Sequence, residues 1–214
     1  ALRAVAGALP DPATLFVSNS MPVRDLDRFV GPTTANVTAL GNRGVSGIDG
    51  IVSSALGAGS GTTDDLTLVV GDLALYHDSN GLLAVDRCDV DVTVVAVDND
   101  GGGIFHKLPI ESFEPPFTES FKTPHGMDFE PLADLHGLDY ARIGARLLAC
   151  FVLEIPLDES PPRRPTPAEV AAHYRRLVMR HHPDRGGDER MFVELQKARD
   201  VLASDSGSAS GGRH

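Results

Sequence analysis

The sequence predicts an α/β domain built on a parallel sheet, followed by a small helical hairpin. Residues 66–70 and 89–97 are apolar runs rich in β-branched side chains, which is typical of buried parallel strands. Each run is followed by Gly, Asp or Asn. Asp72 and Asn99 are 27 positions apart, which leaves room for one helix and one returning strand. Both strand ends can therefore face the same crevice.

Short apolar runs that end in polar residues or glycine predict the strands of this sheet. They span residues 15–17, 35–40, 66–70, 89–97, 140–143 and 147–155. The helices are predicted between them, where prolines and glycines mark starts and stops. They span residues 1–9, 22–29, 46–59, 73–85 and 128–136. Together these elements predict a three-layer α/β domain over residues 1–156.

The segment from His106 to Gly126 is rich in Pro and Phe and shows little periodicity. A long irregular stretch inside a domain is usually functional and often forms a lid. We therefore expect this segment to border the ligand.

Bulk composition is that of a globular protein that does not enter a membrane. Of the 214 residues, 42% are hydrophobic and 23% charged, which is ordinary for soluble domains. Neither a signal peptide nor a membrane-spanning run is predicted. Cys88 and Cys150 lack metal-ligand spacing, so we expect two buried thiols and a cytoplasmic location.

The charge is distributed unevenly along the chain. From residue 161 onward there are 10 Lys/Arg and 7 Asp/Glu, whereas the preceding part holds 9 and 23. Two bodies with different partners are implied. The acidic surface suits a high-salt cytoplasm, and a compositional bias of the genome explains it equally well.

The two strand ends offer ligands for a hard cation. Asp72 supplies a carboxylate, Asn99 an amide oxygen and Gly101 a backbone carbonyl, an all-oxygen set suited to Mg²⁺. The glycines at 101–103 let the backbone approach a diphosphate, as does the start of the helix predicted at Leu73. Taken alone, Gly-Asp and Asn-Asp-Gly also suit ordinary turns.

These residues resemble the Mg²⁺/diphosphate motif of thiamine-diphosphate (ThDP) enzymes. Residues 71–82, which read GDLALYHDSNGL, together with GGGIF at 101–105, narrow the resemblance to one family. It is the 2-succinyl-5-enolpyruvyl-6-hydroxy-3-cyclohexene-1-carboxylate synthase (MenD) family of menaquinone biosynthesis. NSMPVRD at 19–25 and NRGVSGIDG at 42–50 support it. The resemblance covers roughly residues 10–145 and implies the family's carboxyl-terminal pyrophosphate-binding domain.

The resemblance implies roles for further residues. Those implied for ThDP and Mg²⁺ are Ser46, Gly47, Ile48, Gly71, Asp72, Leu73, Ala74, Asn99, Gly101 and Gly102. Those implied for the substrates are Ser20, Arg24, Arg43, Ile104 and Phe105. The guanidinium groups of Arg24 and Arg43 suit carboxylates. Arg24 also reads as a solvated helix residue paired with Asp25 or Asp27, Ile48 as a core residue, and Ile104 or Phe105 as helix packing.

The activity implied is ThDP-dependent decarboxylation of 2-oxoglutarate and addition of the product to isochorismate, a transferase reaction. In ThDP enzymes an activating glutamate comes from a separate pyrimidine-binding domain, usually on another subunit. We see no substitute for it in this sequence. We therefore expect the chain to bind Mg²⁺ and ThDP weakly, and to be inactive without a pyrimidine-binding domain from another chain or a homo-oligomer.

The last part of the chain predicts a second module. A Pro-rich linker at 157–165 precedes a capping box, Thr166 to Glu169, and two amphipathic helices over 166–203. The helices and the His-Pro-Asp between them resemble helices II and III of a J-domain, the co-chaperone module that stimulates DnaK-class ATPases. The implied contacts are His182, Pro183, Asp184, Arg175, Arg176 and Arg180. The Tyr-rich helix I is not evident, and residues 204–214 are predicted to be disordered.

Alternatives remain for this module and for the whole chain. A basic helix is usually a solvated face, and His181-His182 lacks the Cys/His spacing of a zinc site. No base-reading or stacking pattern appears, so nucleic acid is not expected. Two functions are therefore considered for the whole chain: the cofactor-binding part of a carboligase, or a J-type co-chaperone. A third reading is a truncated or fused reading frame without independent activity.

Overall fold

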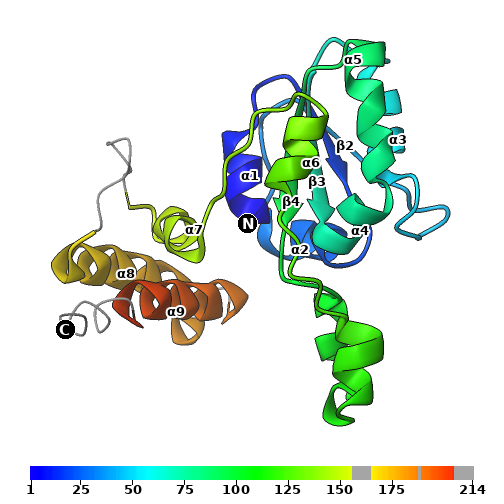
Figure 1. Cartoon of the computed structure of the whole chain (residues 1–214). Helices are drawn as coiled ribbons and strands as arrows, with labels where there is room; N and C mark the ends of the chain where they lie inside the picture. Colours follow the sequence, from blue (N-terminus) through cyan, green and yellow to red (C-terminus); the bar gives the residue numbers. More distant parts are fainter. Residues whose placement is uncertain (156–164, 188, 205–214) are drawn as a thin grey trace, which may run out of the picture. The chain divides into compact units, whose positions relative to one another are not determined.

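The computed structural model describes residues 1–155, 165–187 and 189–204. They divide after Tyr140 into an amino-terminal unit, residues 1–140, and a carboxyl-terminal unit, the described residues from 141 onward (Figure 1). Within the described part of the chain, no helix combines the length and the apolarity needed to cross a membrane.

The amino-terminal unit holds a four-stranded parallel sheet in the order β2-β1-β3-β4. Its strands are β1 (Ala13–Val17), β2 (Val37–Leu40), β3 (Asp65–Gly71) and β4 (Val92–Val97). The two central strands, β1 and β3, are buried almost throughout, as near-continuous apolar runs predict. The predicted α/β fold with a parallel sheet is confirmed. Gly71 pairs with Val97, so the chain leaves β3 and β4 at the same level.

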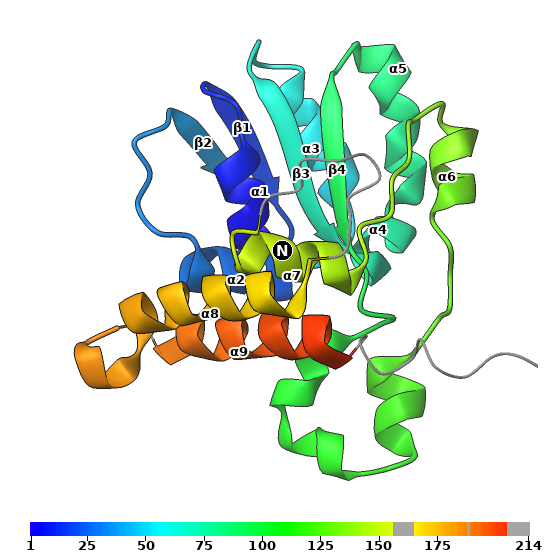
Figure 2. The same cartoon turned by 90° about the vertical axis from the view of Figure 1, so that its left-hand side faces the viewer.

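Helices cover both faces of this sheet, which makes three layers (Figure 2). On one face, α1 (Leu2–Ala8) and α2 (Met21–Phe29) pack on Leu15, Val17 and Val69. The opposite face carries side chains of alternate strand positions, including Phe16, Leu68 and Val70. The helices on that face are α3 (Ile51–Gly59), α4 (Asp72–His77), α5 (Ala84–Cys88) and α6 (Glu130–Leu135). The alternation follows from the two-residue period of a strand.

The helix predicted over 73–85 is broken into α4, a 3₁₀ helix η1 (Ser79–Leu83) and α5. The break occurs at Asp78, a buried side chain whose Oδ2 accepts the backbone N–H of Ser53 at 2.9 Å. Ser53 lies in the first turn of α3, where backbone N–H groups have no partner within the helix. At the break, Asp78 thus supplies an acceptor for an N–H group of α3.

The segment after β4 consists of short turns. They are the 3₁₀ helices η2 (Gly103–Lys107) and η3 (Pro109–Ser112) and the π-helical turn η4 (Thr118–Lys122). In Figure 1 this segment projects beyond the end of the sheet at which α4 begins. Phe117 is buried within it, and the rings of Phe105 and Phe121 meet edge to face. The segment thus has a small apolar core of its own.

The strands predicted at 140–143 and 147–155 are wrong. Residues 140–143 belong to no sheet, and the second run forms α7 (Ala145–Val152). A short apolar run reads equally as a strand or as a buried helix. Here the partners are helices, so the run is helical.

The carboxyl-terminal unit packs α7 with α8 (Pro167–His181) and α9 (Glu189–Ser204), which lie side by side in Figure 2. Thr166 begins α8 with the predicted capping box, and η5 (Pro183–Arg185) lies between α8 and α9. The apolar cluster of this unit consists of Ala149, Cys150, Leu153, Ile155, Val170, Leu177, Met191, Leu195, Ala198 and Leu202. Residues 141–155 therefore group with the hairpin and not with the sheet.

Two further sequence predictions are the linker with the disordered tail, and the two buried thiols. The predicted linker, up to residue 164, and the predicted disordered tail, from residue 205, lie outside the described residues. Cys150 is buried as expected, whereas Cys88 is exposed because it sits at the solvent-facing end of α5.

Candidate cofactor and cation site

A cavity of about 190 Å³ opens where β3 and β4 end. It brings together residues from five separate stretches of the amino-terminal unit. The predicted site residues that line it are Ser20, Ile48, Gly71, Asp72, Leu73, Ala74, Asn99, Gly101, Gly102, Ile104 and Phe105. The strand-end rule for open α/β sheets explains this convergence.

Asp72 lies at the centre of the polar part of this cavity. Its side chain is buried, and its Oδ1 accepts the backbone N–H of Leu73 at 2.8 Å. Its Oδ2 accepts the backbone N–H groups of Asn99 at 3.1 Å and Gly101 at 2.8 Å. One carboxylate thus joins the end of β3 to the loop that follows β4.

The backbone donors around Asp72 keep it ionised. Burial by itself would raise the pKa of this carboxyl group. The N–H groups of Gly101 and Leu73, the side chain of His125 and the N–H of Asn99 outweigh burial, so the pKa lies below its usual value. A buried negative charge is what a cation site requires.

This lowered pKa predicts how stability depends on pH. A carboxyl group with a depressed pKa in the folded state stabilises the fold above the pKa of the unfolded chain. That contribution is lost as the pH falls through the folded-state pKa, that is, in the acid range below about 4. Denaturant unfolding between pH 6 and pH 3 should therefore show a steeper loss of stability for the wild type than for Asp72→Asn. Parallel curves would contradict the prediction.

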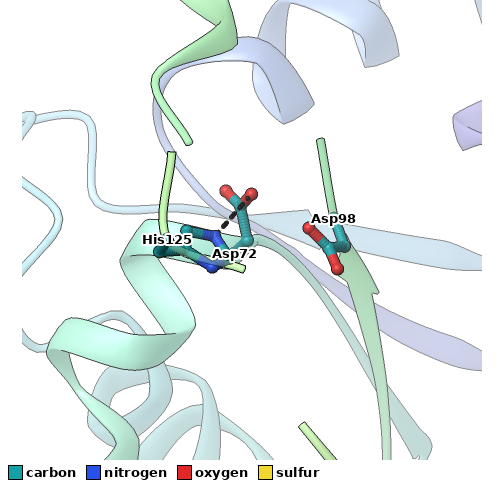
Figure 3. Close-up of side chains that lie close together, drawn as sticks. All are labelled: Asp72, Asp98 and His125. Carbon is teal, nitrogen blue, oxygen red and sulfur yellow. Dashed lines mark hydrogen bonds and ion pairs between the residues drawn. The ribbon is translucent and has the colours of Figure 1, made fainter. Parts of the chain in front are cut away.

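His125 contacts Asp72, although the sequence did not predict it as a site residue. Its Nε2 lies 3.1 Å from Asp72 Oδ2, and its Nδ1 accepts the backbone N–H of Met127 at 3.0 Å (Figure 3). Since Nδ1 is the acceptor, Nε2 carries the proton and donates to Asp72. The only sequence signal is a histidine after Thr123-Pro124 in a segment without periodicity; its partner is 53 residues away.

Two groups of residues at this end of the sheet could hold a cation. Asp72, Asp98 and His125 bring ligand atoms within 4.8 Å of one another (Figure 3). A metal at this trio would have to displace the Nε2 proton and its hydrogen bond to Asp72. The oxygen set of Asp72, Asn99 and Gly101 is the other possible site.

The loop 99–103, here called the glycine loop, brings the backbone N–H groups of the other two predicted ligand residues to Asp72. The amide of Asn99 lies across Gly103, where a Cβ would come within 2.8 Å of its Nδ2. Gly101 is buried and has φ +118°, a conformation that side-chain-bearing residues rarely adopt. Glycine is thus needed at 101, whereas a side chain at 103 would displace the Asn99 amide.

Four predicted residues lie outside this cavity. Arg24 donates from Nη1 to the backbone oxygen of Ser20 at 2.6 Å, and Ser46 is exposed. Arg43 donates to Asn19 Oδ1 at 2.7 Å, and Asn19 in turn donates to the backbone oxygen of Gly47 at 2.8 Å. Arg43 and Gly47 line a neighbouring open hollow of about 470 Å³. Because Asn19 lines the cavity, it links Arg43 to it.

The predicted chaperone contacts lie on the surface of the carboxyl-terminal unit. Pro183 and Asp184 are exposed, and His182 Nδ1 accepts the backbone N–H of Asp184 at 3.2 Å. The His182 ring also packs on Phe192 of α9, with 5.1 Å between centroids. The basic residues of α8, all exposed, are Arg175, Arg176 and Arg180. Arg176 pairs with Glu154 at 3.1 Å, which ties α8 to the residues after α7.

Comparison with known proteins identifies relatives of most of the chain. The sequence is 87% identical over 146 residues to the 2-succinyl-5-enolpyruvyl-6-hydroxy-3-cyclohexene-1-carboxylate synthase of Halorubrum lacusprofundi. It is 67% identical over 144 residues to the synthase of the same name from Haloquadratum walsbyi, and 55% over 139 residues to that of Roseiflexus castenholzii. These matches cover 64–68% of this chain and 23–24% of each relative. No family model matches.

The first match necessarily includes the polar part of the candidate site. Any stretch of 146 residues in a chain of 214 contains residues 69–146. Asp72, the glycine loop and His125 therefore lie within it. The chain spans about a quarter of the length of the curated relatives it matches. Over about two thirds of its length, this chain is similar to part of the 2-succinyl-5-enolpyruvyl-6-hydroxy-3-cyclohexene-1-carboxylate synthases (MenD).

Proposed function

We propose that the amino-terminal unit is the cofactor-binding part of a ThDP- and Mg²⁺-dependent carboligase of menaquinone biosynthesis. The observation that carries this proposal is the ionised Asp72 carboxylate, held between two strand ends by the N–H groups of Leu73, Asn99 and Gly101. The names of the relatives point to the same reaction class.

The residues present suit Mg²⁺ and a diphosphate. Asp72 and the amide of Asn99 are hard oxygen donors of the kind that Mg²⁺ prefers. The glycine loop has no side chains at 101–103, so a diphosphate can approach its backbone closely. ThDP, when bound, supplies the electron sink for decarboxylation and carbon–carbon bond formation.

The chain's own residues then have three tasks. Asp72, Asn99 and Gly101 hold the cation, and Leu73 and Ala74 at the start of α4 face the diphosphate. Ile48, which is partly exposed in the same cavity, supplies an apolar support for the cofactor. Arg24, bonded to the Ser20 backbone, and Arg43, bonded to Asn19, supply guanidinium groups for carboxylates, the groups that 2-oxoglutarate and isochorismate share.

Turnover in this proposal requires a pyrimidine-binding domain with the activating glutamate, from another chain, a second copy or a longer form of this one. The relatives are about four times as long as the matched segment, which is consistent with a further domain.

Calorimetry tests the binding part of this proposal. Titrating ThDP into the protein in the presence of MgCl₂ should release heat, and the same titration after removal of divalent cations with EDTA should not. A cation-independent signal would contradict the proposed bridging role of Mg²⁺, and the absence of heat at millimolar ThDP would contradict the site itself.

A second candidate function belongs to the carboxyl-terminal unit, a J-type co-chaperone. The observation in its favour is α7, which gives the predicted hairpin a third helix and completes an apolar cluster. The exposed Pro183 and Asp184 and the exposed arginines of α8 provide the surface for a DnaK-class partner.

The ATPase rate of a DnaK-class chaperone tests this second candidate. The wild-type chain should raise the single-turnover rate, and His182→Gln should abolish the increase. His136→Gln, at a histidine of the amino-terminal unit, is the matched control and should stimulate like the wild type. An ATPase rate that the wild type leaves unchanged would overturn this candidate.

A further inference from the structure

The glycine loop has few restraints of its own. Asn99 and Asp100 are exposed, Asp100 has φ +57° and Gly101 φ +118°. Three consecutive glycines lose more backbone entropy on ordering than other residues do. A loop of this composition therefore needs contacts with other residues to keep a single conformation for ligand binding.

Those contacts come from residues 121–126, here called the clasp. Lys122 Nζ donates to the backbone oxygens of Asn99 at 2.6 Å and Asp100 at 2.7 Å. In return, the backbone N–H of Gly102 donates to the oxygen of Lys122 at 2.7 Å. A Cβ on Gly101 would lie 2.0 Å from that same oxygen, so the two backbones meet as closely as glycine allows.

The second half of the clasp holds the same loop by a different group. Asp100 Oδ1 accepts the backbone N–H groups of His125 at 2.9 Å and Gly126 at 2.8 Å. These two donors hold the pKa of Asp100 below its usual value, Gly126 contributing most. Asp100 is thereby turned away from the cavity, and the side chain of His125 reaches Asp72.

The Lys122 ammonium has a particular role in this arrangement. It satisfies two consecutive carbonyl groups on one side of the loop. The N–H groups of Asn99 and Gly101, on the same stretch of backbone, donate to Asp72. The peptide unit between Asp100 and Gly101 is therefore held at both ends, its carbonyl by the Lys122 ammonium and its N–H by the Asp72 carboxylate.

We propose that Lys122 is a positioning residue that, through the clasp, fixes the glycine loop in the conformation that binds Mg²⁺ and diphosphate. The effect on ligand binding rests on the proposed function above. The ordering of the loop does not, because every contact that carries it exists in the ligand-free protein.

The test compares Lys122→Met with Lys122→Arg and with Lys107→Met, an exposed lysine of the same segment. NMR-detected hydrogen exchange at Gly101 and Gly102 in ligand-free protein reports the order of the loop. Calorimetry with MgCl₂ and ThDP reports affinity. Circular dichroism confirms that each variant folds.

Lys122→Met should accelerate exchange at both glycines by at least about ten-fold and raise the Kd for ThDP with Mg²⁺ by about ten-fold, the scale of a lost hydrogen bond to a charged group. Lys122→Arg should recover part of both effects, because guanidinium also donates to carbonyl oxygens. Lys107→Met should match the wild type. If Lys122→Met does not fold, Asp100→Ala provides a second test at an exposed position. It removes the acceptor that the loop offers to the N–H groups of His125 and Gly126 in the clasp, and it should accelerate exchange in the same way.

The outcomes separate this inference from the proposed function. Suppose that the wild type binds ThDP and that Lys122→Met or Asp100→Ala keeps the wild-type exchange rates and affinity. The proposed role of the clasp would then be rejected, while the cofactor site would be retained. Faster exchange in the variants, with a wild type that binds no ThDP, would support the clasp and reject the cofactor site.

Discussion

Asp72→Asn is expected to abolish measurable binding of ThDP in the presence of Mg²⁺, with the Kd raised at least about a hundred-fold. Removing even an outer partner of a metal ligand costs roughly ten- to a hundred-fold in affinity, and Asp72 is the only anionic group of the proposed oxygen set. The substitution keeps the shape of the side chain and removes its charge. Calorimetry with MgCl₂ and ThDP measures the change.

Asp98→Asn is the matched control for this experiment. Asp98 is exposed, follows the strand β4, and loses the same charge while keeping the oxygen that accepts the N–H of Asp100. Its affinity for ThDP should stay within about three-fold of the wild type, the scale of a weakly coupled surface charge. Equal losses in the two variants would mean that general charge near the cavity, and not Asp72 as a ligand, governs binding.

Leu153→Ala is expected to destabilise the carboxyl-terminal unit by about 2–5 kcal/mol, the cost of removing a buried leucine side chain. Leu153 is fully buried in the cluster that joins the end of α7 to α8 and α9. A unit of this size has a small free energy of unfolding, so the loss is a large share of it. Hydrogen exchange in α8 and α9 should rise strongly, while exchange in β1 and β3 stays at the wild-type rate.

Met179→Ala tests whether the effect comes from burial. Met179 lies on α8 of the same unit but is 55% exposed, so its truncation should change the free energy of unfolding by less than about 1 kcal/mol. If Leu153→Ala left exchange in α8 unchanged, α7 would not be part of the hairpin's core, and the helical hairpin would be stable by itself.

Much of the amino-terminal unit was predictable because its signals are local. The central strands are continuous apolar runs, and residues that follow parallel strands lie at one edge whatever the rest of the chain does. For that reason Asp72 and Asn99 could be placed together from spacing and strand type. The family resemblance added Ser20, Ile48 and Ile104, which line the same cavity.

Other features had no local signal. The predicted helix breaks at Asp78, whose side chain accepts the N–H of Ser53, 25 residues away. Nothing near Lys122 or His125 in the sequence indicates that their partners lie at 99–100 and at Asp72. Long-range polar contacts leave no periodicity, so they become visible only in the folded chain.

The sequence by itself determined which runs can be strands, where those strands end, and which oxygen-bearing residues follow them, because these depend on neighbours a few positions apart. Tertiary structure alone decided the rest. It made residues 145–152 a helix, since a short apolar run takes the form of the partners it packs against. It also decided that Asp72 receives three backbone N–H groups and a histidine, because these donors come from residues 27 to 53 positions away that only the folded chain brings to one carboxylate, apart from the adjacent Leu73.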